Sequence, residues 1–457
     1  MVKLVMSEKL IIDKIEQEKE DYIEFFRKLV QSDSINPPGN EKNVALIIEE
    51  FLKDKKIKTD VFPFGNNRAN LVAYLNDSFD GRNLLFNGHM DTVPVSSEED
   101  WKYPPLSAFM KRNKLMFGRG TTDMKGGLAA MVIALKIIKG LGIEVSGNLI
   151  LNAVADEETG GNFGTGWCVN NPLKEIKCDF AIIGEATGLN PLPKAILVGE
   201  KGHLQVNITT NGISGHSGMP AMSKNAIYMM SEIIEKLDKL DEYLPKTEPP
   251  MKFDKLKKLI AVTSPSEEIF ERILKEQPDL NGVLQTLTTF SKALTMIKGG
   301  IKVNVIPDSC EAVLDVRLLP KQKSVHIMEA LKKLIEVDLG YAVKDKTSAI
   351  SNEIFVELLK ISDSEGSYWS DWEESTDLKE FYSIVETIYE KKPFYFLLPA
   401  SADAHFLRNK GFCPQTILFG PGRGRTAHAA DEYIEILDFI RAIKVYTIFA
   451  YRFLTKK

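Results

Sequence analysis

The sequence predicts an α/β protein with a mixed, mostly parallel sheet flanked by helices and with an inserted α+β domain. Segments with helical spacing of apolar residues alternate with short apolar runs. Several of these runs are continuously apolar, which is typical of strands buried on both faces of a sheet. The inserted domain is indicated by a change near residue 201, after which apolar and polar residues alternate as in half-exposed antiparallel strands.

The α/β pattern occupies the first 200 residues and returns near the end of the chain. Before residue 201 we expect helices at about 7–30, 42–52 and 126–141, and strands at 70–75, 83–86, 148–155 and 180–184. After the insertion we expect a helix at 377–389, strands at 394–398 and 415–419, and a closing helix at 433–453. The main domain is therefore predicted to comprise residues 1–200 and 373–457.

The segment between these parts has its own pattern. Alternating strands are expected at 203–212, 302–306 and 311–317, a further strand at 354–361, and helices at 225–240 and 324–337. The stretch SEGSYWSDWEEST resembles a crossing back to the main domain. We therefore predict an inserted α+β domain over residues 201–372.

The composition excludes several classes of protein. Among 457 residues, lysine and arginine total 58 and aspartate and glutamate total 63, and this net charge of −5 is too mild for a nucleic-acid-binding scaffold. No apolar run approaches the ~20 residues that cross a bilayer, and the first residues lack a signal-peptide core, so we expect a cytoplasmic protein. The four cysteines are too sparse for a disulfide framework and are expected to be small buried side chains.

Two polar positions of the main domain suggest metal ligands. His89 ends an apolar run in NGHMDTVP, and Asp91, two residues later, could accept a hydrogen bond from the other ring N–H of a metal-bound histidine. Taken alone, the pair also fits a loop histidine beside a solvent-facing aspartate. Asp123 lies in GRGTTDMKGG before a helix, where it suits either a bridging metal ligand or an N-cap.

Three adjacent carboxylates close another apolar strand. Asp156, Glu157 and Glu158 follow this strand in VADEETGG, where they are costly unless a cation or hydrogen bonds compensate them. One glutamate could bind metal while its neighbour takes a proton from an activated water. A solvated charge run is the alternative, but this one opens onto two glycines.

Two further elements complete a candidate ligand set. Glu185 ends the apolar run DFAIIGEAT, and His428 follows a strand and a Gly-rich loop in TILFGPGRGRTAHAADE. Ligands of open α/β sheets collect at the carboxyl ends of strands, so we expect these side chains to lie together. Two histidines and three carboxylates fit zinc, cobalt or manganese, and one shared carboxylate would suit two ions ~3.5–4 Å apart.

Eight motifs, in order from residue 87 to residue 432, resemble the binuclear-zinc aminoacylase family. This family includes acetylornithine deacetylase, succinyl-diaminopimelate desuccinylase, aminoacylase and glutamate carboxypeptidase. The motifs are NGHMDTVP, GRGTTDMKGG, DEETGG, GEAT, GISGHSGMP, GGIKVNVIPD, DVRLLP and GPGRGRTAHAADE. The resemblance implies a zinc exopeptidase-like catalytic domain, an inserted lid and dimerisation domain, and two divalent ions, with zinc first and cobalt or manganese as alternatives.

The resemblance also implies a ligand set. Asp123 corresponds to the bridging ligand, and His89 and Glu185 correspond to ligands of the two separate metals. Glu158 is expected to pair with His89, and His428 with Glu185.

Further roles in the main domain follow from the same resemblance. Glu157 resembles the general base that deprotonates the attacking water and later protonates the leaving amine. Asp91 resembles the partner that orients His89. The family often has a cis peptide after the bridging aspartate, here to Met124.

In the inserted domain, His216 resembles a histidine that stabilises the oxyanion, often from the partner subunit of a homodimer. Asn304 and Arg317 resemble substrate-binding residues, and the arginine could hold a carboxylate through two parallel hydrogen bonds. Without the resemblance, Arg317 would be a strand-surface charge. His203 and His326 are expected to be structural or surface residues, and His405 is given no role.

The expected activity is metal-dependent hydrolysis of an amide bond in an N-acyl amino acid or a short peptide with a free carboxylate. A binuclear-zinc aminopeptidase or dipeptidase, and a non-catalytic member of the family, are the alternatives. GEAT replaces the commoner GEPT, Gly218 replaces a small hydroxyl residue, and the stretch 241–290 is longer than in the smallest members. The segment TTFSKALTMIKGGIKVNVIP is closer to the broad peptidase and acyl-amino-acid hydrolase branch, so the acyl group stays open. Neither nucleic acid nor a membrane is an expected partner.

Overall fold

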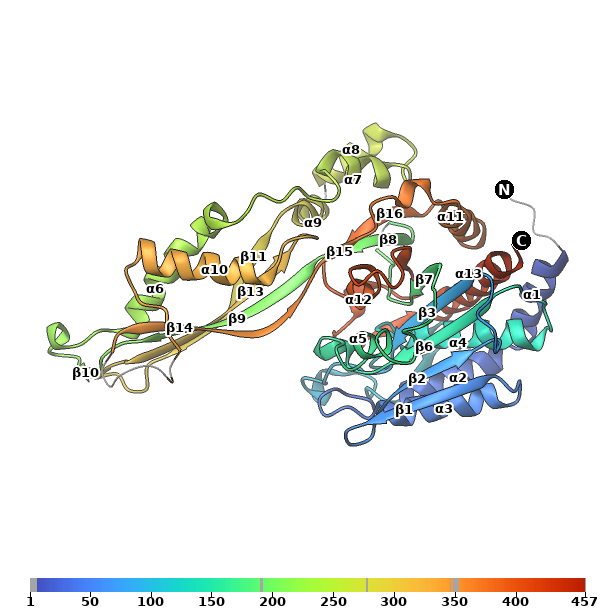
Figure 1. Cartoon of the computed structure of the whole chain (residues 1–457), viewed down its shortest axis with the longest axis horizontal. Helices are drawn as coiled ribbons and strands as arrows, with labels where there is room; N and C mark the ends of the chain where they lie inside the picture. The colour runs from blue at the N-terminus through green and yellow to red at the C-terminus, as the bar shows by residue number, and fades with distance from the viewer. Residues whose placement is uncertain (1–5, 190–191, 277, 346, 348–352, 457) are drawn as a thin grey trace.

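The structure is a computed structural model that describes residues 6–189, 192–276, 278–345, 347 and 353–456. A main domain with a large central sheet occupies one end of the molecule, and a narrower inserted domain extends from it (Figure 1). The chain passes from the central sheet to the inserted sheet between β8 (Ala195–Glu200) and β9 (Gly202–Asn211). It returns between β14 (Phe355–Ser364) and β15 (Ser367–Tyr368).

Within the described residues, nine strands form the central sheet, in the order β1-β2-β6-β3-β7-β17-β8-β15 with β16 also paired to β8. The strands not yet given are β1 (Lys58–Phe64), β2 (Arg68–Tyr74), β3 (Asn83–His89), β6 (Asn148–Val154), β7 (Phe180–Ile183), β16 (Phe394–Leu398) and β17 (Thr416–Leu418). The central block β6-β3-β7-β17 is parallel throughout, whereas β1, β2 and β15 pair in antiparallel fashion. The predicted mixed, mostly parallel α/β class is confirmed.

Helices cover both faces of this sheet, which explains why β3 and β6 are buried at every position. Consecutive residues of β3 face opposite sides: a Cβ added to Gly88 would meet Met124 and Leu128, whereas Asn87 faces Asp403. The first face carries α1 (Met6–Gln17), α2 (Lys19–Gln31), α3 (Glu41–Lys53), α4 (Lys125–Gly140), α11 (Thr376–Tyr389) and α13 (Ile436–Thr455). The second face carries α5 (Thr165–Cys168) and α12 (Ala404–Arg408).

The inserted domain is an antiparallel sheet in the order β11-β13-β9-β14, with β11 (Ser291–Gly299) and β13 (Ser309–Leu318) as the strands not yet given. One face packs on α6 (Ala226–Lys236) and α10 (Ser324–Lys333), and β9 and β13 alternate buried and half-buried residues as predicted. A small ladder of β10 (Gly215–His216) and β12 (Val305–Ile306) lies at the end of this domain that is remote from the central sheet (Figure 1).

Three helices inside the inserted segment were not predicted. They are α7 (Phe253–Ala261), α8 (Glu267–Glu276) and α9 (Pro278–Thr288). Leu256, Ile260 and Phe270 belong to the same apolar core as the main domain, and α7 packs against β16. A part of the segment 201–372 therefore completes the main domain rather than the inserted one.

Several boundaries differ from the expectations. The helix predicted at 7–30 bends at Glu18, because α1 packs on α13 while α2 packs on α4. The closing helix begins at Ile436, since Tyr433–Glu435 forms β18 beside β5 (Leu115–Phe117) and β4 (Phe109–Lys111). The strand predicted at 302–306 shrinks to β12, and the edge strand β11 was missed because most of its side chains are exposed. Among the described helices, none has the length and apolarity that a membrane span requires.

Candidate metal centre

The sheet topology brings the predicted ligands to one edge. His89 is the last residue of β3, Glu157 and Glu158 follow β6, and Glu185 follows β7. His428 lies in the loop after β17. Because β6, β3, β7 and β17 are neighbouring parallel strands, their carboxyl ends meet at the same place.

Asp123, which stands before α4, lies between the two histidines. Its Oδ1 is 3.0 Å from His89 Nε2, and its Oδ2 is 3.1 Å from His428 Nε2. The Asp123–Met124 peptide is cis, as the resemblance implied. Each carboxylate oxygen therefore faces a different histidine, which is the arrangement that a shared ligand requires.

Two groups of three side chains, sharing Asp123, each place their ligand atoms within 4.8 Å of one another. The first group, site A, is His89, Asp123 and Glu185; the second, site B, is Asp123, Glu158 and His428. The expected pairing of Glu158 with His89 and of His428 with Glu185 is wrong. Since β7 is the neighbour of β3, Glu185 lies beside His89, and Glu158 reaches across to His428 with its Oε2 3.3 Å from Nε2.

The donor chemistry fits two divalent cations. Both sites offer only nitrogen and carboxylate oxygen, the donors that zinc, cobalt and manganese accept. Glu158 Oε1 is buried without a hydrogen-bond partner, which is costly for a carboxylate oxygen unless a cation meets it. Among the described residues, Glu158 Oε1 is therefore a potential ligand atom that no protein group satisfies.

Burial and repulsion between neighbouring carboxylates favour the protonated forms of the glutamates in this cluster. Burial raises the pKa of Glu157 and Glu158 and brings that of Glu185 to about 8. Hydrogen bonds to Asp123 and Glu158 raise the pKa of His428 to about 10. Metal binding displaces protons from such ligands, so cations can replace the protons that balance these charges.

Asp91 lies directly behind the cluster and is fully buried. The nearest partner of His89 Nδ1 is the backbone oxygen of Asp91, at 2.9 Å, while the carboxylate Oδ1 lies at 3.5 Å. The carboxylate accepts hydrogen bonds from the backbone N–H groups of Glu157 and Glu158 at 3.3 and 3.2 Å. Asp91 thus orients His89 mainly through its backbone, and its side chain fixes the turn that carries both glutamates.

Glu157 belongs to neither group of three, although it lies next to site A. Its Oε2 is 3.9 Å from His89 Nε2, and its side chain is 15% exposed. The turn that carries it is fixed by Asp156, whose carboxylate accepts hydrogen bonds from Thr159 Oγ1 at 2.7 Å and from the Phe163 N–H at 2.9 Å. A carboxylate that is held beside the ligands without being one of them can accept and return a proton.

The structure does not bring the inserted-domain candidates to this cluster. His216 and Asn304 are exposed and lie on or beside β10 and β12, at the remote end of the molecule (Figure 1). Arg317 lies near the junction of the domains, on β13 opposite His203, and its Nε donates to Asp315 Oδ1 at 2.8 Å. His203 is half-buried, with its ring nitrogens 3.2 and 3.0 Å from the hydroxyls of Ser362 and Ser364.

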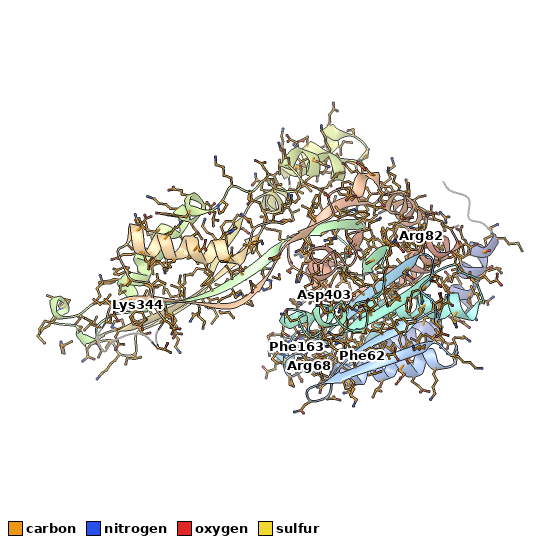
Figure 2. All side chains as sticks on the ribbon, in the orientation of Figure 1. Phe62, Arg68, Arg82, Phe163, Lys344 and Asp403 are labelled. Carbon is orange, nitrogen blue, oxygen red and sulfur yellow. The ribbon has the colours of Figure 1, made fainter. Side chains whose placement is uncertain are left out.

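Sequence reasoning missed several buried polar residues around the centre. Asp403, labelled in Figure 2, accepts a hydrogen bond from Thr165 Oγ1 at 2.6 Å and lies 3.5 Å from Asn87 Nδ2, which ties α12 to β3 and α5. Arg119 and Glu432 form a buried pair beneath Asp123. Arg119 and Glu432 stand within the motifs GRGTTDMKGG and GPGRGRTAHAADE, and Asp403 stands near His405, but a charged residue in such a position is too common a signal to select from.

This chain has relatives among known protein families and named proteins. The family model described as peptidase family M20/M25/M40 matches residues 85–452. A probable succinyl-diaminopimelate desuccinylase of Staphylococcus epidermidis is 26% identical over 439 residues, covering 94% of this chain and 96% of the relative. A succinyl-diaminopimelate desuccinylase of Hydrogenovibrio crunogenus is 32% identical over 238 residues, covering 49% of this chain and 60% of the relative.

Solved structures share the whole fold. The M20 family metallo-carboxypeptidase Sso-CP2 from Sulfolobus solfataricus superposes with a TM-score of 0.75 at 21% identity, covering 95% of this chain and 99% of the other. Human carnosine dipeptidase 1 superposes with a TM-score of 0.73 at 15% identity, covering 99% and 100%. The family model spans most of the chain, including every residue of sites A and B; the chain therefore belongs to peptidase family M20/M25/M40 and is a hydrolase of amide bonds.

Proposed function

We propose that this protein hydrolyses the amide bond of N-acyl amino acids or short peptides that carry a free carboxylate, with one divalent cation in site A and one in site B. The observation that carries the proposal is the shared position of Asp123, whose two carboxylate oxygens lie 3.0 and 3.1 Å from two different histidines. Zinc is the cation that we propose, since imidazole and carboxylate donors suit it, with cobalt or manganese as alternatives.

The chain's own residues divide the work of the reaction. Bound cations would supply Lewis-acid activation of the scissile carbonyl and of the attacking water. Glu157 accepts the proton of that water and delivers it to the leaving amine, because it is held beside site A without serving as a ligand. Asp91 keeps the Nε2 lone pair of His89 directed at site A by accepting the Nδ1 proton on its backbone oxygen.

Substrate recognition is assigned to the inserted domain. Arg317 lies beside the domain junction, where its guanidinium can turn from Asp315 to a substrate carboxylate. An arginine that binds a carboxylate favours substrates with a free carboxylate, such as acylated amino acids, over substrates recognised by a free amine. The names of the relatives supply one candidate, a succinylated diamino acid, and those of the fold neighbours supply C-terminal residues and dipeptides. For this chain we propose a small-molecule substrate with a carboxylate near the scissile amide.

We also propose a homodimer formed through the inserted domain. His216 and Asn304 cannot reach the metal centre of their own chain in this conformation, because they lie at the remote end of the inserted sheet. The loop beside Asn304 exposes Ile301 and Val303 at 94% and 101%, and the edge strand β11 exposes Met296 at 67%. Exposed apolar side chains along an unpaired strand edge are suited to burial against a second copy, which would place His216 near the partner's centre.

A cytoplasmic location completes the proposal. All four cysteines are free and buried, which is usual for proteins of reducing compartments.

Hydrolysis assays with metal-loaded and chelator-treated protein test the proposed activity. The panel comprises N-acetyl, N-succinyl and dipeptide substrates, each with a free and with an amidated carboxylate. We expect turnover that chelation abolishes, that zinc or cobalt restores, and that requires the free carboxylate. Equal turnover of the amidated substrates, or turnover that survives chelation, would contradict the proposed function.

A further inference from the structure

A buried ion pair lies beneath the ligand shared by the two sites. Arg119 and Glu432 are 2% and 0% exposed, and Arg119 Nη1 is 2.7 Å from Glu432 Oε2. The guanidinium carbon lies over the indole ring of Trp101, 5.2 Å from the ring centroid. Neither residue is a ligand of site A or site B.

Glu432 holds the backbone from which Asp123 projects. Its Oε1 accepts hydrogen bonds from the backbone N–H of Thr122 at 2.8 Å and of Asp123 at 3.1 Å. Its own backbone oxygen accepts a hydrogen bond from the N–H of Gly118 at 2.9 Å. The residues from Gly118 to Asp123 are therefore hydrogen-bonded to Glu432, in the segment that follows His428.

Arg119 holds the loop that carries His428. Its Nη2 donates to the backbone oxygen of His428 at 3.3 Å, and its Nη1 donates to that of Ala429 at 3.5 Å. His428 has a left-handed backbone, with φ of 62°, which a non-glycine residue rarely adopts without support. Buried hydrogen-bond donors directed at this loop provide that support.

Sites A and B differ in how rigidly their histidines are held. His89 ends a fully buried strand and is 1% exposed, so the central sheet itself fixes it. The side chain of His428 is 54% exposed and stands on a loop. The histidine of site B therefore depends on contacts that fix its loop, whereas the histidine of site A does not.

We propose that Arg119, anchored by Glu432, is a positioning residue for site B. Arg119 holds His428 at the distance from Asp123 and Glu158 that a cation requires, and thereby sets the affinity of site B apart from that of site A. This inference rests on the proposed two-cation centre and adds which buried arginine controls the second cation. A purely structural pair would change the stability of the protein without separating the two affinities.

Two conservative variants separate these possibilities. Arg119→Lys keeps the charge opposite Glu432 but lacks the fork that reaches two carbonyl oxygens. Glu432→Gln keeps the shape and one acceptor for the Thr122 and Asp123 N–H groups but turns an amide donor toward Arg119. Replacement of Glu432 by alanine is avoided, because it would leave Arg119 buried without a counter-charge.

The matched control is Arg82→Lys. Arg82 pairs with Asp377, with two nitrogen–oxygen distances of 3.2 and 2.5 Å, and it precedes β3, at the end of that strand opposite to His89 (Figure 2). The control thus alters an arginine–carboxylate pair that touches no ligand-bearing loop.

The measurement is a calorimetric titration of metal-free protein with Co²⁺, together with the visible absorption of the bound cobalt. For wild-type protein and Arg82→Lys we expect two binding events. For Arg119→Lys we expect the event that belongs to site B to lose about 10–100-fold in affinity, with the other changed by less than about threefold. For Glu432→Gln we expect both events to weaken, because Glu432 holds the backbone of Asp123, which both sites share. A His428→Ala variant identifies the event of site B, because it removes a ligand of that site alone.

Each outcome has a distinct meaning. Two events of unchanged affinity in Arg119→Lys, or an equal loss in both of its events, would overturn the positioning role while leaving the proposed function intact. A single binding event in wild-type protein would contradict the two-cation centre itself, and this inference with it. Unfolding temperatures of the metal-free proteins show whether a loss of affinity follows from a loss of fold, which would also overturn the role.

Discussion

The main domain and the inserted domain differ in how they hold their functional residues. The main domain gathers His89, Glu158, Glu185 and His428 from four neighbouring strands and closes them around Asp123. The inserted domain leaves His216 exposed at the remote end of its sheet. A parallel sheet edge collects a site within one chain, whereas an extended domain can complete a site only by moving or by reaching a second copy.

The largest expected effect tests whether Glu157, in the main domain, carries out the proton transfer of the reaction. Glu157→Ala should lower kcat by about 10²–10⁴-fold while both cations stay bound, because Glu157 is not a ligand. Steady-state kinetics and elemental analysis of the same preparation check this, with the exposed Glu144→Ala as control. Wild-type kcat in Glu157→Ala would remove Glu157 from the mechanism.

The next effect tests whether His216 of one subunit contributes to the metal centre of the partner subunit. His216→Ala should lower kcat by about 10²-fold, the scale on which an oxyanion donor acts. Mixing His216→Ala with Glu157→Ala subunits should restore activity, because on the order of one site in four then receives both wild-type residues from different chains. Activity that stays at the level of the single variants after subunit exchange would refute the contribution across the dimer.

A smaller effect concerns recognition of the substrate carboxylate. Arg317→Ala should reduce kcat/KM by about 10–100-fold for substrates with a free carboxylate, since a charge-assisted bidentate contact is lost. Carboxyl-amidated analogues should be nearly unaffected. An equal loss for both substrate forms would assign Arg317 to the fold of the sheet rather than to binding.

The smallest effect compares two histidines at the junction of the domains. Burial lowers the pKa of His405, on the main-domain side, to about 4, and burial also lowers the pKa of His203 on the inserted sheet. Because the folded pKa of His405 lies below its unfolded value of about 6.5, the unfolded chain binds the extra proton, and stability is lost as the pH falls from 6.5 toward 4. Wild-type protein should lose about 2 kcal/mol at pH 5 through His405.

Thermal unfolding at pH 7.5 and pH 5 checks this comparison. His405→Gln should narrow the difference between the two unfolding temperatures, and His203→Gln should narrow it less, since His203 is less completely buried. An unchanged difference in His405→Gln would show that other groups cause the acid sensitivity.

Four of the five candidate ligands could be predicted because they follow an apolar strand, directly or through a loop, whereas Asp123 stands in a turn before a helix. Their pairing could not be predicted in the same way. Whether Glu158 meets His89 or His428 depends on which strands are neighbours and on the direction of one tight turn. The resemblance to a family pointed to residues that the structure brings together, but it implied other pairs, so the geometry was needed to separate site A from site B.

The residues that support the centre could not be found from the sequence, because their contacts are remote along the chain. Arg119 meets Glu432, and Thr165 meets Asp403, and no local periodicity links such positions. The helices α7 to α9 were missed because the prolines and lysines at the start of the stretch indicated a loop, although apolar residues recur at helical spacing in α7 and α8. Tertiary contacts thus decided the supporting pairs, whereas α7 and α8 carry a helical pattern of their own.

The most direct test of the account is a crystal structure of the cobalt-loaded protein with anomalous scattering at the metal edge. The account predicts two peaks, one among His89, Asp123 and Glu185 and the other among Asp123, Glu158 and His428. A single peak, or two peaks at which Glu158 shares a cation with His89, would contradict the division of the centre into site A and site B.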